Sequence, residues 1–240
     1  MRLVQVTDTH LLADPAGRSR KGEPLRQLHA VLARAHSLRP DVVLMTGDVA
    51  QDETPVAYRH ACDAFGELAC PWFWIPGNHD QPELMAAAHP LLESIDLGSW
   101  RVLLLNTRVS GQPGGAVGVE QLQRLAEQLE ADDRPTLIAL HHPPLAIGSV
   151  WMDAIGLADR DALWQTLAPY PQVKAMLCGH IHQAFAAREG MVEVYGCPAT
   201  SDQFLPLSHE FAVDEAARPG LRVVDFTHDS LHTWIERVDL

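Results

Sequence analysis

Seven side chains stand just after apolar, strand-like segments of the chain, and their chemical types suit metal coordination. They are Asp8, His10, Asp48, Asn78, His141, His180 and His182. In an extended chain, residues i and i+2 point to the same side, so an Asp-x-His or a His-x-His pair can reach one metal ion or a metal pair. If the carboxylate of Asp48 bridges two ions, the set predicts four protein ligands for each ion and room for a bridging hydroxide.

Each of the motifs that carry these residues also has an ordinary structural explanation. The motifs are Asp8-Thr9-His10, Gly47-Asp48, Gly77-Asn78-His79-Asp80, His141-His142 and Gly179-His180-Ile181-His182. Gly, Asn and Asp favour turns, and a lone histidine is more often a packed residue than a ligand. All five motifs in one chain, each at the end of an apolar run, are poorly explained by packing. Together they predict a hydrolase that uses two metal ions.

The composition bounds the class of protein. A chain of 240 residues with 47% hydrophobic residues can bury a substantial core, and we expect one domain over residues 1–240. The formal charge of −13 opposes nonspecific binding to nucleic acid. No apolar stretch approaches the ~20 residues that span a bilayer. Without a signal-peptide pattern or Cys-x-x-Cys spacing, we expect reduced cysteines and a cytoplasmic protein that binds no membrane.

Apolar periodicity predicts alternating strands and helices over the first three quarters of the chain. The expected strands are residues 2–6, 41–46, 72–75, 100–106, 136–140 and 173–178, and the expected helices are 24–37, 54–69, 119–130 and a short one ending at 167. A loop rich in Pro and Gly is expected between residues 143 and 159. In the last quarter, the pattern predicts a meander of strands at 183–188, 191–195, 221–226 and 231–238. This pattern indicates an α/β layered domain with mixed sheets.

The five motifs resemble those of the calcineurin-like metallophosphoesterase superfamily, whose pattern is complete here between Asp8 and His182. The resemblance implies a four-layered α/β/β/α sandwich of two mixed sheets with the metals at the strand ends. It also implies that one ion is held by Asp8, His10, Asp48 and His182, and the other by Asp48, Asn78, His141 and His180. Iron and manganese are the expected ions, and zinc also suits these ligands.

The same resemblance implies roles around the metals. His79 would be the catalytic residue that contacts the phosphate without binding a metal. The residues expected to contact the substrate are His10, Asn78, His79 and His182. Behind them, Asp80 and His142 are expected to orient His79 or the phosphate.

Finer features separate branches of this superfamily. The residues after Gly47-Asp48 lack the extension of the protein phosphatases, and Gln51 stands where purple acid phosphatases have a metal-binding tyrosine. The motifs above and the segment from Pro198 to Phe204 look like those of bacterial class III cyclic nucleotide phosphodiesterases. This likeness predicts hydrolysis of 3′,5′-cyclic AMP to 5′-AMP by a hydroxide that bridges the metals. The chain ends without the tail that some relatives carry.

Two alternatives stay open. A hydrolase of other small phosphodiesters, such as glycerophosphodiesters, would use the same ligands. A non-catalytic metal-binding regulatory protein would be expected to lack a ligand or His79, and neither is missing. A nuclease fits less well because the chain is acidic. The expected partner is a small cyclic nucleotide, and the sequence is compatible with a monomer or a homodimer.

Overall fold

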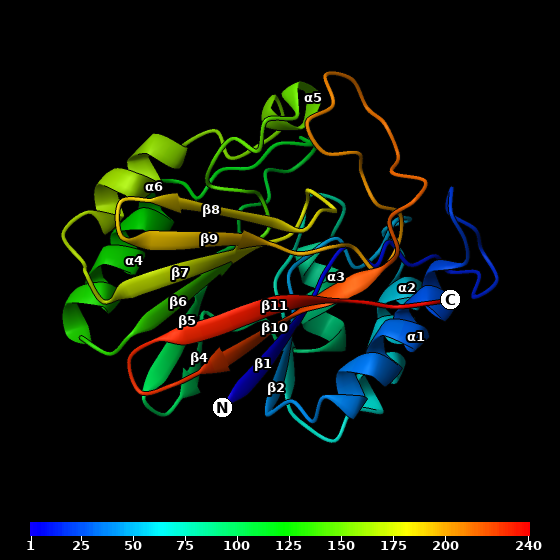
Figure 1. Ribbon diagram of the computed structural model, residues 1–240, viewed down its shortest axis with the longest axis horizontal. Coiled ribbons are helices and arrows are strands. Elements are labelled where there is room, and N and C mark those ends of the chain that lie inside the picture. Colours follow the sequence, from blue (N-terminus) through cyan, green and yellow to red (C-terminus); the bar gives the residue numbers. More distant parts are fainter.

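The computed structural model describes all 240 residues as two mixed β-sheets packed face to face, with helices on both outer faces (Figure 1). The five-stranded sheet has the order β11 (Leu231–Arg237), β10 (Gly220–Phe226), β1 (Arg2–Val6), β2 (Val42–Met45) and β3 (Trp72–Trp74). The six-stranded sheet has the order β4 (Ser94–Leu97), β5 (Trp100–Leu104), β6 (Thr136–Leu140), β7 (Val173–Cys178), β9 (Val192–Gly196) and β8 (Phe185–Glu189).

Six helices complete the four layers. On the five-stranded sheet lie α1 (Pro24–Ser37), α2 (Pro55–Gly66) and α3 (Pro82–Ala88), and on the other lie α4 (Val119–Ala131), α5 (Val150–Asp153) and α6 (Arg160–Leu167). The start of α2 follows from local chemistry, because the Thr54 hydroxyl accepts a hydrogen bond from the Ala57 N–H and Pro55 needs no partner for its nitrogen. The α/β/β/α sandwich implied by the sequence is confirmed.

Alternation along the strands produces these layers. Successive residues of a strand face opposite sides of the sheet. In β1, Val4 packs against the helices while Leu3 packs against the other sheet. In β7, Met176 faces the helices and Leu177 faces inward. The strands at the centre of either sheet are therefore buried on both faces, which explains why most of their residues are apolar.

Polar contacts also join the two sheets. The Gln5 amide in β1 donates to the Cys178 carbonyl in β7 at 3.0 Å. The buried Arg222 in β10 donates to the carbonyls of Phe185 and Gly196 in the other sheet, at 3.1 and 2.9 Å. These bonds fix how the sheets are placed relative to each other, and therefore the distance between residues that follow strands of different sheets.

The motifs converge because their strands run in the same direction. Strands β1, β2 and β3 are parallel to one another, as are β5, β6, β7 and β9. The carboxyl ends of β1, β2, β3, β6 and β7 lead into the five motifs. In both sheets these ends meet at one edge of the sandwich, so the motif side chains lie in one cluster.

Most of the expected elements are present, and three differences have local causes. Helix α3 was not predicted because it buries only Met85 and so has no apolar periodicity. Strand β4 was not predicted because it is a four-residue strand at the sheet edge. The expected loop contains α5, a single turn of helix.

The expected meander of the last quarter is wrong. The β8–β9 hairpin joins the six-stranded sheet, where β9 pairs in parallel with β7, while the β10–β11 hairpin joins the other sheet beside β1. Each hairpin is a local structure that the sequence indicates, but the sheet it joins depends on distant strands. The segment between Gly196 and Gly220 therefore passes from one sheet to the other.

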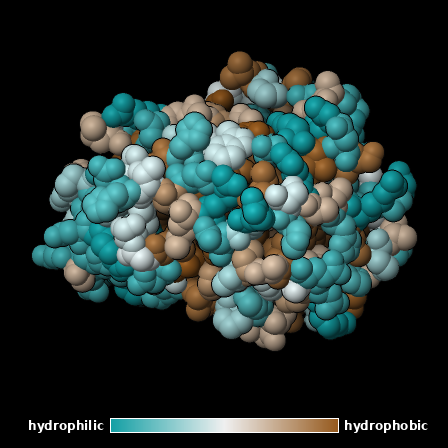
Figure 2. All heavy atoms as spheres, turned by 60° about the horizontal axis from the view of Figure 1, so that its bottom comes forward, coloured by the Kyte–Doolittle hydropathy of each residue, from teal (hydrophilic) through white to brown (hydrophobic).

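Polar and apolar side chains are mixed over the surface. On the face in Figure 2, small groups of hydrophobic residues are interspersed among hydrophilic ones. None of the helices is both long enough and apolar enough to span a lipid bilayer.

Candidate metal centre

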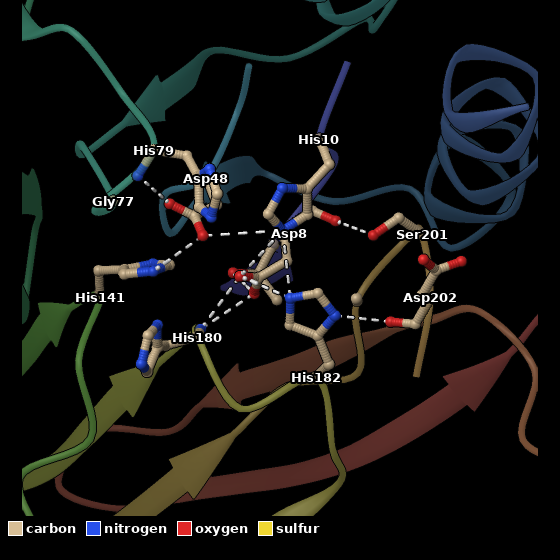
Figure 3. A network of polar contacts seen from close by, with 12 residues as sticks. Asp8, His10, Asp48, Gly77, His79, His141, His180, His182, Ser201 and Asp202 are labelled. Atoms are coloured by element: carbon tan, nitrogen blue, oxygen red, sulfur yellow. Dashed lines mark hydrogen bonds and ion pairs between the residues drawn. The ribbon is translucent and has the colours of Figure 1, made fainter. Parts of the chain in front are cut away.

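The predicted ligands from the ends of β1, β2 and β7 meet in one group (Figure 3). The His182 Nε2 lies 3.2 Å from Asp8 Oδ1 and 3.2 Å from His10 Nε2. The His10 Nε2 lies 3.6 Å from Asp48 Oδ2. Two carboxylates and two imidazoles therefore face one small volume, an arrangement with the donor types of an iron, manganese or zinc site.

A second group shares the Asp48 carboxylate. The His141 Nε2 lies 3.4 Å from Asp48 Oδ2 and 3.2 Å from Asn78 Oδ1. The His180 ring lies beside that of His141, with 5.1 Å between the ring centres. Since Asp48 Oδ2 faces both His10 and His141, the seven predicted ligands form two adjoining donor sets with a common carboxylate.

Each of the four histidines predicted as ligands has its other ring nitrogen held by an oxygen acceptor. The contacts are His10 Nδ1 to Gln51 Oε1 at 2.8 Å, His141 Nδ1 to the Thr46 carbonyl at 2.8 Å, His182 Nδ1 to the Asp202 carbonyl at 2.6 Å, and His180 Nε2 to the Ile155 carbonyl at 3.2 Å. A nitrogen that faces an acceptor carries the ring proton, so the other nitrogen keeps its lone pair. The tautomers that metal binding needs are thus set by the protein.

The backbone at the centre adopts an uncommon conformation. Asp8, His10, Asp48, His180 and His182 have φ angles between 46° and 67°, and they make up five of the eight non-glycine residues with positive φ in the chain. A left-handed residue with a side chain costs about 1–2 kcal/mol, and such residues cluster at functional sites. This concentration of strain supports a functional role for the cluster.

Two motif glycines leave room for the ligands. A Cβ on Gly77 would lie 2.2 Å from Asp48 Oδ1, and one on Gly47 would lie 2.5 Å from His141 Nδ1. Either contact is far inside van der Waals distance. Gly47 also has a φ of 97°, which side chains disfavour. The glycines are required by the close approach of the ligands as well as by the turn.

Protonation in this cluster follows the balance between burial and charge. Burial raises the pKa of Asp48, but the neighbouring His141 outweighs it and holds that pKa well below its ordinary value. Burial disfavours the charged form of His141, but Asp48 raises its pKa to about 9. Burial lowers the pKa of His10 to about 4, and burial with the nearby His142 and His141 lowers that of His180. In the metal-free pair formed by His141 and Asp48, His141 is therefore protonated and Asp48 is ionised.

Asp80 joins two of the ligand loops. Its buried carboxylate accepts hydrogen bonds from the N–H groups of Val49 at 3.0 Å, Ala50 at 3.1 Å and Gly77 at 2.9 Å, and from the Tyr58 hydroxyl at 3.3 Å. Burial and the nearby Asp48 raise its pKa to about 6. Asp80 thus fixes the loop of Asp48 against the loop of Asn78, and its partners are backbone N–H groups and the Tyr58 hydroxyl rather than the His79 ring.

His142 lies behind the ligands with both ring nitrogens engaged. Its Nδ1 is 2.8 Å from the Thr107 hydroxyl, and its Nε2 is 3.2 Å from the Pro113 carbonyl. Its ring packs against those of His141 and His180, with ring centres 5.0 and 4.6 Å apart. Burial lowers its pKa to about 3, so it is a neutral packing partner for two ligand rings.

His79 lies at the surface of the cluster, and Gln51 connects it to His10. The Gln51 amide oxygen accepts from His10 Nδ1, and its amide nitrogen lies 3.5 Å from His79 Nδ1. An amide N–H can only donate, so His79 Nδ1 accepts and the ring proton is on Nε2. Both residues line a cavity of about 610 Å³ that also exposes His10, Asn78 and His182. All four residues expected to contact substrate thus face one cavity.

Several supporting residues were not found by the sequence analysis. Gln51 was noted only as the replacement of a tyrosine, yet it contacts both His10 and His79. Asp202 and Ser201, from the segment after β9, contact His182 Nδ1 and the Asp8 carbonyl through a backbone oxygen and a hydroxyl, respectively. For Gln51 a signal existed, because it is the third residue after Asp48, the position of the tyrosine in purple acid phosphatases. The sequence carries no signal for contacts that backbone carbonyls make.

The family model of the calcineurin-like phosphoesterases matches residues 1–184. The chain belongs to this family of metallophosphoesterases. Among curated relatives, 3′,5′-cyclic adenosine monophosphate phosphodiesterase CpdA of Pseudomonas aeruginosa is 40% identical, over 99% of this chain and 90% of the relative. The CpdA of Escherichia coli strain K12 is 35% identical, over 99% of this chain and 90% of the relative.

Solved structures agree with the fold. A dimetal phosphatase from Danio rerio superposes with a TM-score of 0.72 at 13% identity, and 99% of each chain is covered. A purple acid phosphatase from yellow lupin seeds superposes with a TM-score of 0.68 at 16% identity, covering 98% of this chain and 51% of the other. At these identities the likeness concerns the arrangement of the sheets and helices.

We predict that metal affinity rises with pH. Because the pKa of His141 in the metal-free protein is about 9, a proton must leave this ring when a metal binds at neutral pH. The apparent affinity for Mn²⁺ should rise by up to about tenfold per pH unit from about pH 6.5 to about pH 8.5. Calorimetric titrations in buffers of different ionisation enthalpy would measure both the affinity and the released proton. An affinity that stays constant over this range contradicts the prediction.

The raised pKa of His141 also affects the stability of the metal-free protein. The folded-state pKa of His141 is above the ordinary value of 6.5, so its contribution to the free energy of unfolding is fully present below about pH 6.5. It should be lost as the pH rises through about 9. Urea denaturation of the metal-free protein at several pH values checks the sign.

Replacing Asp80 with Asn should weaken both the fold and the centre. In Asp80→Asn, an amide NH₂ group faces backbone N–H donors, which should lower the free energy of unfolding by about 1–3 kcal/mol. Metal affinity should fall by about 10–100-fold because the ligand loops lose their common anchor. The matched control is Asp133→Asn, at an exposed aspartate, for which neither quantity should change. Equal metal affinity in the two variants would remove the anchoring role.

Proposed function

We propose that this protein is a binuclear-metal phosphodiesterase that hydrolyses 3′,5′-cyclic AMP to 5′-AMP. The observation that carries the proposal is the pair of donor sets joined by Asp48, which opens into the cavity lined by His79. The names of the relatives from P. aeruginosa and E. coli, each matched along almost all of this chain, support cyclic AMP as the substrate.

The residues fit two metal ions by the chemistry of their donors. One ion would be held by Asp8, His10, Asp48 and His182, and the other by Asp48, Asn78, His141 and His180. Imidazole, carboxylate and amide donors favour iron or manganese, and zinc is also compatible. When bound, such a pair makes water more acidic and offsets the charge of phosphate oxygens.

The side chains of this chain would position the phosphate and assist the leaving oxygen. Gln51 keeps the proton of His79 on Nε2, the nitrogen that remains available to a phosphate in the cavity. His79 would donate a hydrogen bond to the 3′-oxygen as the P–O bond breaks and negative charge develops there. A hydrogen bond that strengthens in the transition state raises the rate of the chemical step.

Charge and enclosure support a small diester as the substrate. Acidic residues outnumber Lys and Arg by 31 to 18, so the protein's overall field repels a nucleic acid strand. The residues that line the cavity come from many parts of the chain between His10 and Phe211. This supports residues 1–240 acting as one domain.

The direct test is hydrolysis by protein loaded with Mn²⁺ or Fe²⁺. Cyclic AMP, glycerophosphocholine and an aryl phosphodiester would be compared at equal concentration, with product followed by chromatography. We expect metal-dependent release of 5′-AMP well above turnover of the other two substrates. Turnover of the aryl diester with negligible hydrolysis of cyclic AMP would overturn the substrate but keep the hydrolase. No turnover with both metals bound would overturn the enzyme.

We predict that His79→Ala lowers kcat for cyclic AMP by about 10²–10⁴-fold, the range for loss of one acid–base or hydrogen-bonding group. The stoichiometry and affinity of Mn²⁺ should stay unchanged because His79 is not one of the proposed ligands. His232→Ala, at an exposed histidine in β11, is the matched control and should keep full activity. Full activity of His79→Ala with metal bound would remove His79 from the mechanism.

A further inference from the structure

One wall of the cavity is aromatic and has no part in the chemistry described above. It consists of Trp151 in α5 and of Phe204 and Phe211 in the segment between β9 and β10, and we call these three residues the aromatic wall. Their ring centres lie 5.1–5.4 Å apart in edge-to-face arrangements. In Figure 1 the two parts of the chain lie together above the carboxyl ends of the strands.

The wall reaches from the metal centre to the mouth of the cavity. At the inner end, the Phe204 ring stacks on His182, with 3.9 Å between ring centres and 10° between planes. At the outer end, Phe211 is 47% exposed although it is a large apolar residue. The guanidinium of Arg20 lies 5.1 Å from the centre of the Phe211 ring. A planar cation over one face of an exposed aromatic ring is thus presented at the opening.

Arg20 is held near Phe211 by Asp202. The Asp202 Oδ1 accepts hydrogen bonds from the Ser19 hydroxyl at 3.0 Å and from the Lys21 N–H at 2.8 Å, and its Oδ2 lies 3.8 Å from Arg20 Nη1. The backbone carbonyl of the same residue accepts from His182. One residue therefore fixes both the loop that carries Arg20 and a proposed metal ligand, so the opening has a defined distance from the centre.

Planar heterocycles bind to such a surface. A nucleobase stacked on an aromatic side chain gains about 1–3 kcal/mol, and an arginine guanidinium stacks on the same kind of ring. Arg18 and Arg20 are the only Arg or Lys side chains in the cavity lining, and both lie in this loop. In a nucleotide the base is separated from the phosphate by one sugar ring, which suits a phosphate at the centre and a base at the mouth.

We propose that Phe211 and Arg20 form a nucleobase subsite that selects a nucleotide among small phosphodiesters. Phe204 is a positioning residue, because its face is already covered by His182 and it links the subsite to the centre. This inference rests on the proposed cyclic nucleotide activity, and it adds the residues that distinguish a nucleotide from a diester without a base.

The test measures binding of the base alone. The dissociation constants of 5′-AMP and ribose 5-phosphate are compared by calorimetry on the manganese-loaded protein. Their ratio isolates the base because both ligands carry the same sugar phosphate. We expect 5′-AMP to bind about tenfold more tightly in the unmodified protein, near the lower end of the range for one stacked base. In Phe211→Ala the ratio of the two dissociation constants should fall to nearly one, and in Arg20→Gln it should fall about threefold.

Two further variants separate stacking from packing. Phe211→Trp should keep the preference for 5′-AMP, while Phe211→Leu, which keeps an apolar side chain without a ring face, should lose it. Leu207→Ala is the matched control, since Leu207 is 76% exposed in the same segment but does not line the cavity. It should bind both ligands as the unmodified protein does.

The outcomes distinguish this inference from the proposed function. Equal binding of the two ligands by the unmodified protein, or a preference that survives in both Phe211→Ala and Phe211→Leu, overturns the nucleobase subsite. If either occurs while cyclic AMP is hydrolysed, the proposed function stands alone. If the preference depends on Phe211 but cyclic AMP is not hydrolysed, the subsite stands and the proposed reaction is wrong.

Discussion

The left-handed turns that follow the strands are the constraint on which the rest of the structure depends. At the ends of β1, β2 and β7, the backbone must turn at once so that a side chain points back over the sheet edge. The cost of these turns is met by backbone bonds between neighbouring loops, such as Asp8 N–H to the Gly47 carbonyl and His10 N–H to the Asp48 carbonyl, both at 3.0 Å. The sheets supply parallel strand ends at fixed spacing, and the loops exchange hydrogen bonds across them.

A second consequence of this arrangement is electrostatic. The side chains of Asp8 and Asp48 are almost completely buried, so neither charge is stabilised by water. For Asp8, the cost of burial is exceeded by the attraction of His182, and its pKa stays below the ordinary value. Protons on imidazoles and metal ions are thus alternative ways to neutralise the same carboxylates. Cations inside the cluster therefore stabilise it, which is a property expected of a metal site rather than of an apolar core.

Sequence predicts well which motif residues come together, because the signals are local. An apolar strand that ends in Gly-Asp or Asp-x-His carries its own signal, and parallel strands bring such ends together without further information. The supporting contacts are different. Gln51 lies beside His10 because the chain after β1 and the chain after β2 continue side by side, with the Gln51 N–H bonded to the Leu11 carbonyl at 2.8 Å. The acceptors from Thr46 and Asp202 are backbone carbonyls, which any residue type supplies.

The segment that crosses between the sheets could be predicted least. Local sequence patterns predict the hairpins β8–β9 and β10–β11. They do not indicate that the two hairpins join different sheets. That crossing brings Asp202 and Phe204 onto His182. The failure has a physical reason, since the partner of a strand is chosen by burial of surfaces that lie far apart in the chain.

The family match ends before part of the cavity wall begins. The family model ends at residue 184, just past the last of the seven proposed ligands, His182, whereas Phe204 and Phe211 lie beyond it. The family match therefore includes the proposed ligands and Trp151 but not Phe204 or Phe211, whereas the relatives from P. aeruginosa and E. coli align with almost the whole chain. On such a scaffold, new substrates can arise by exchange of one connecting segment while the hydrolytic machinery is retained unaltered.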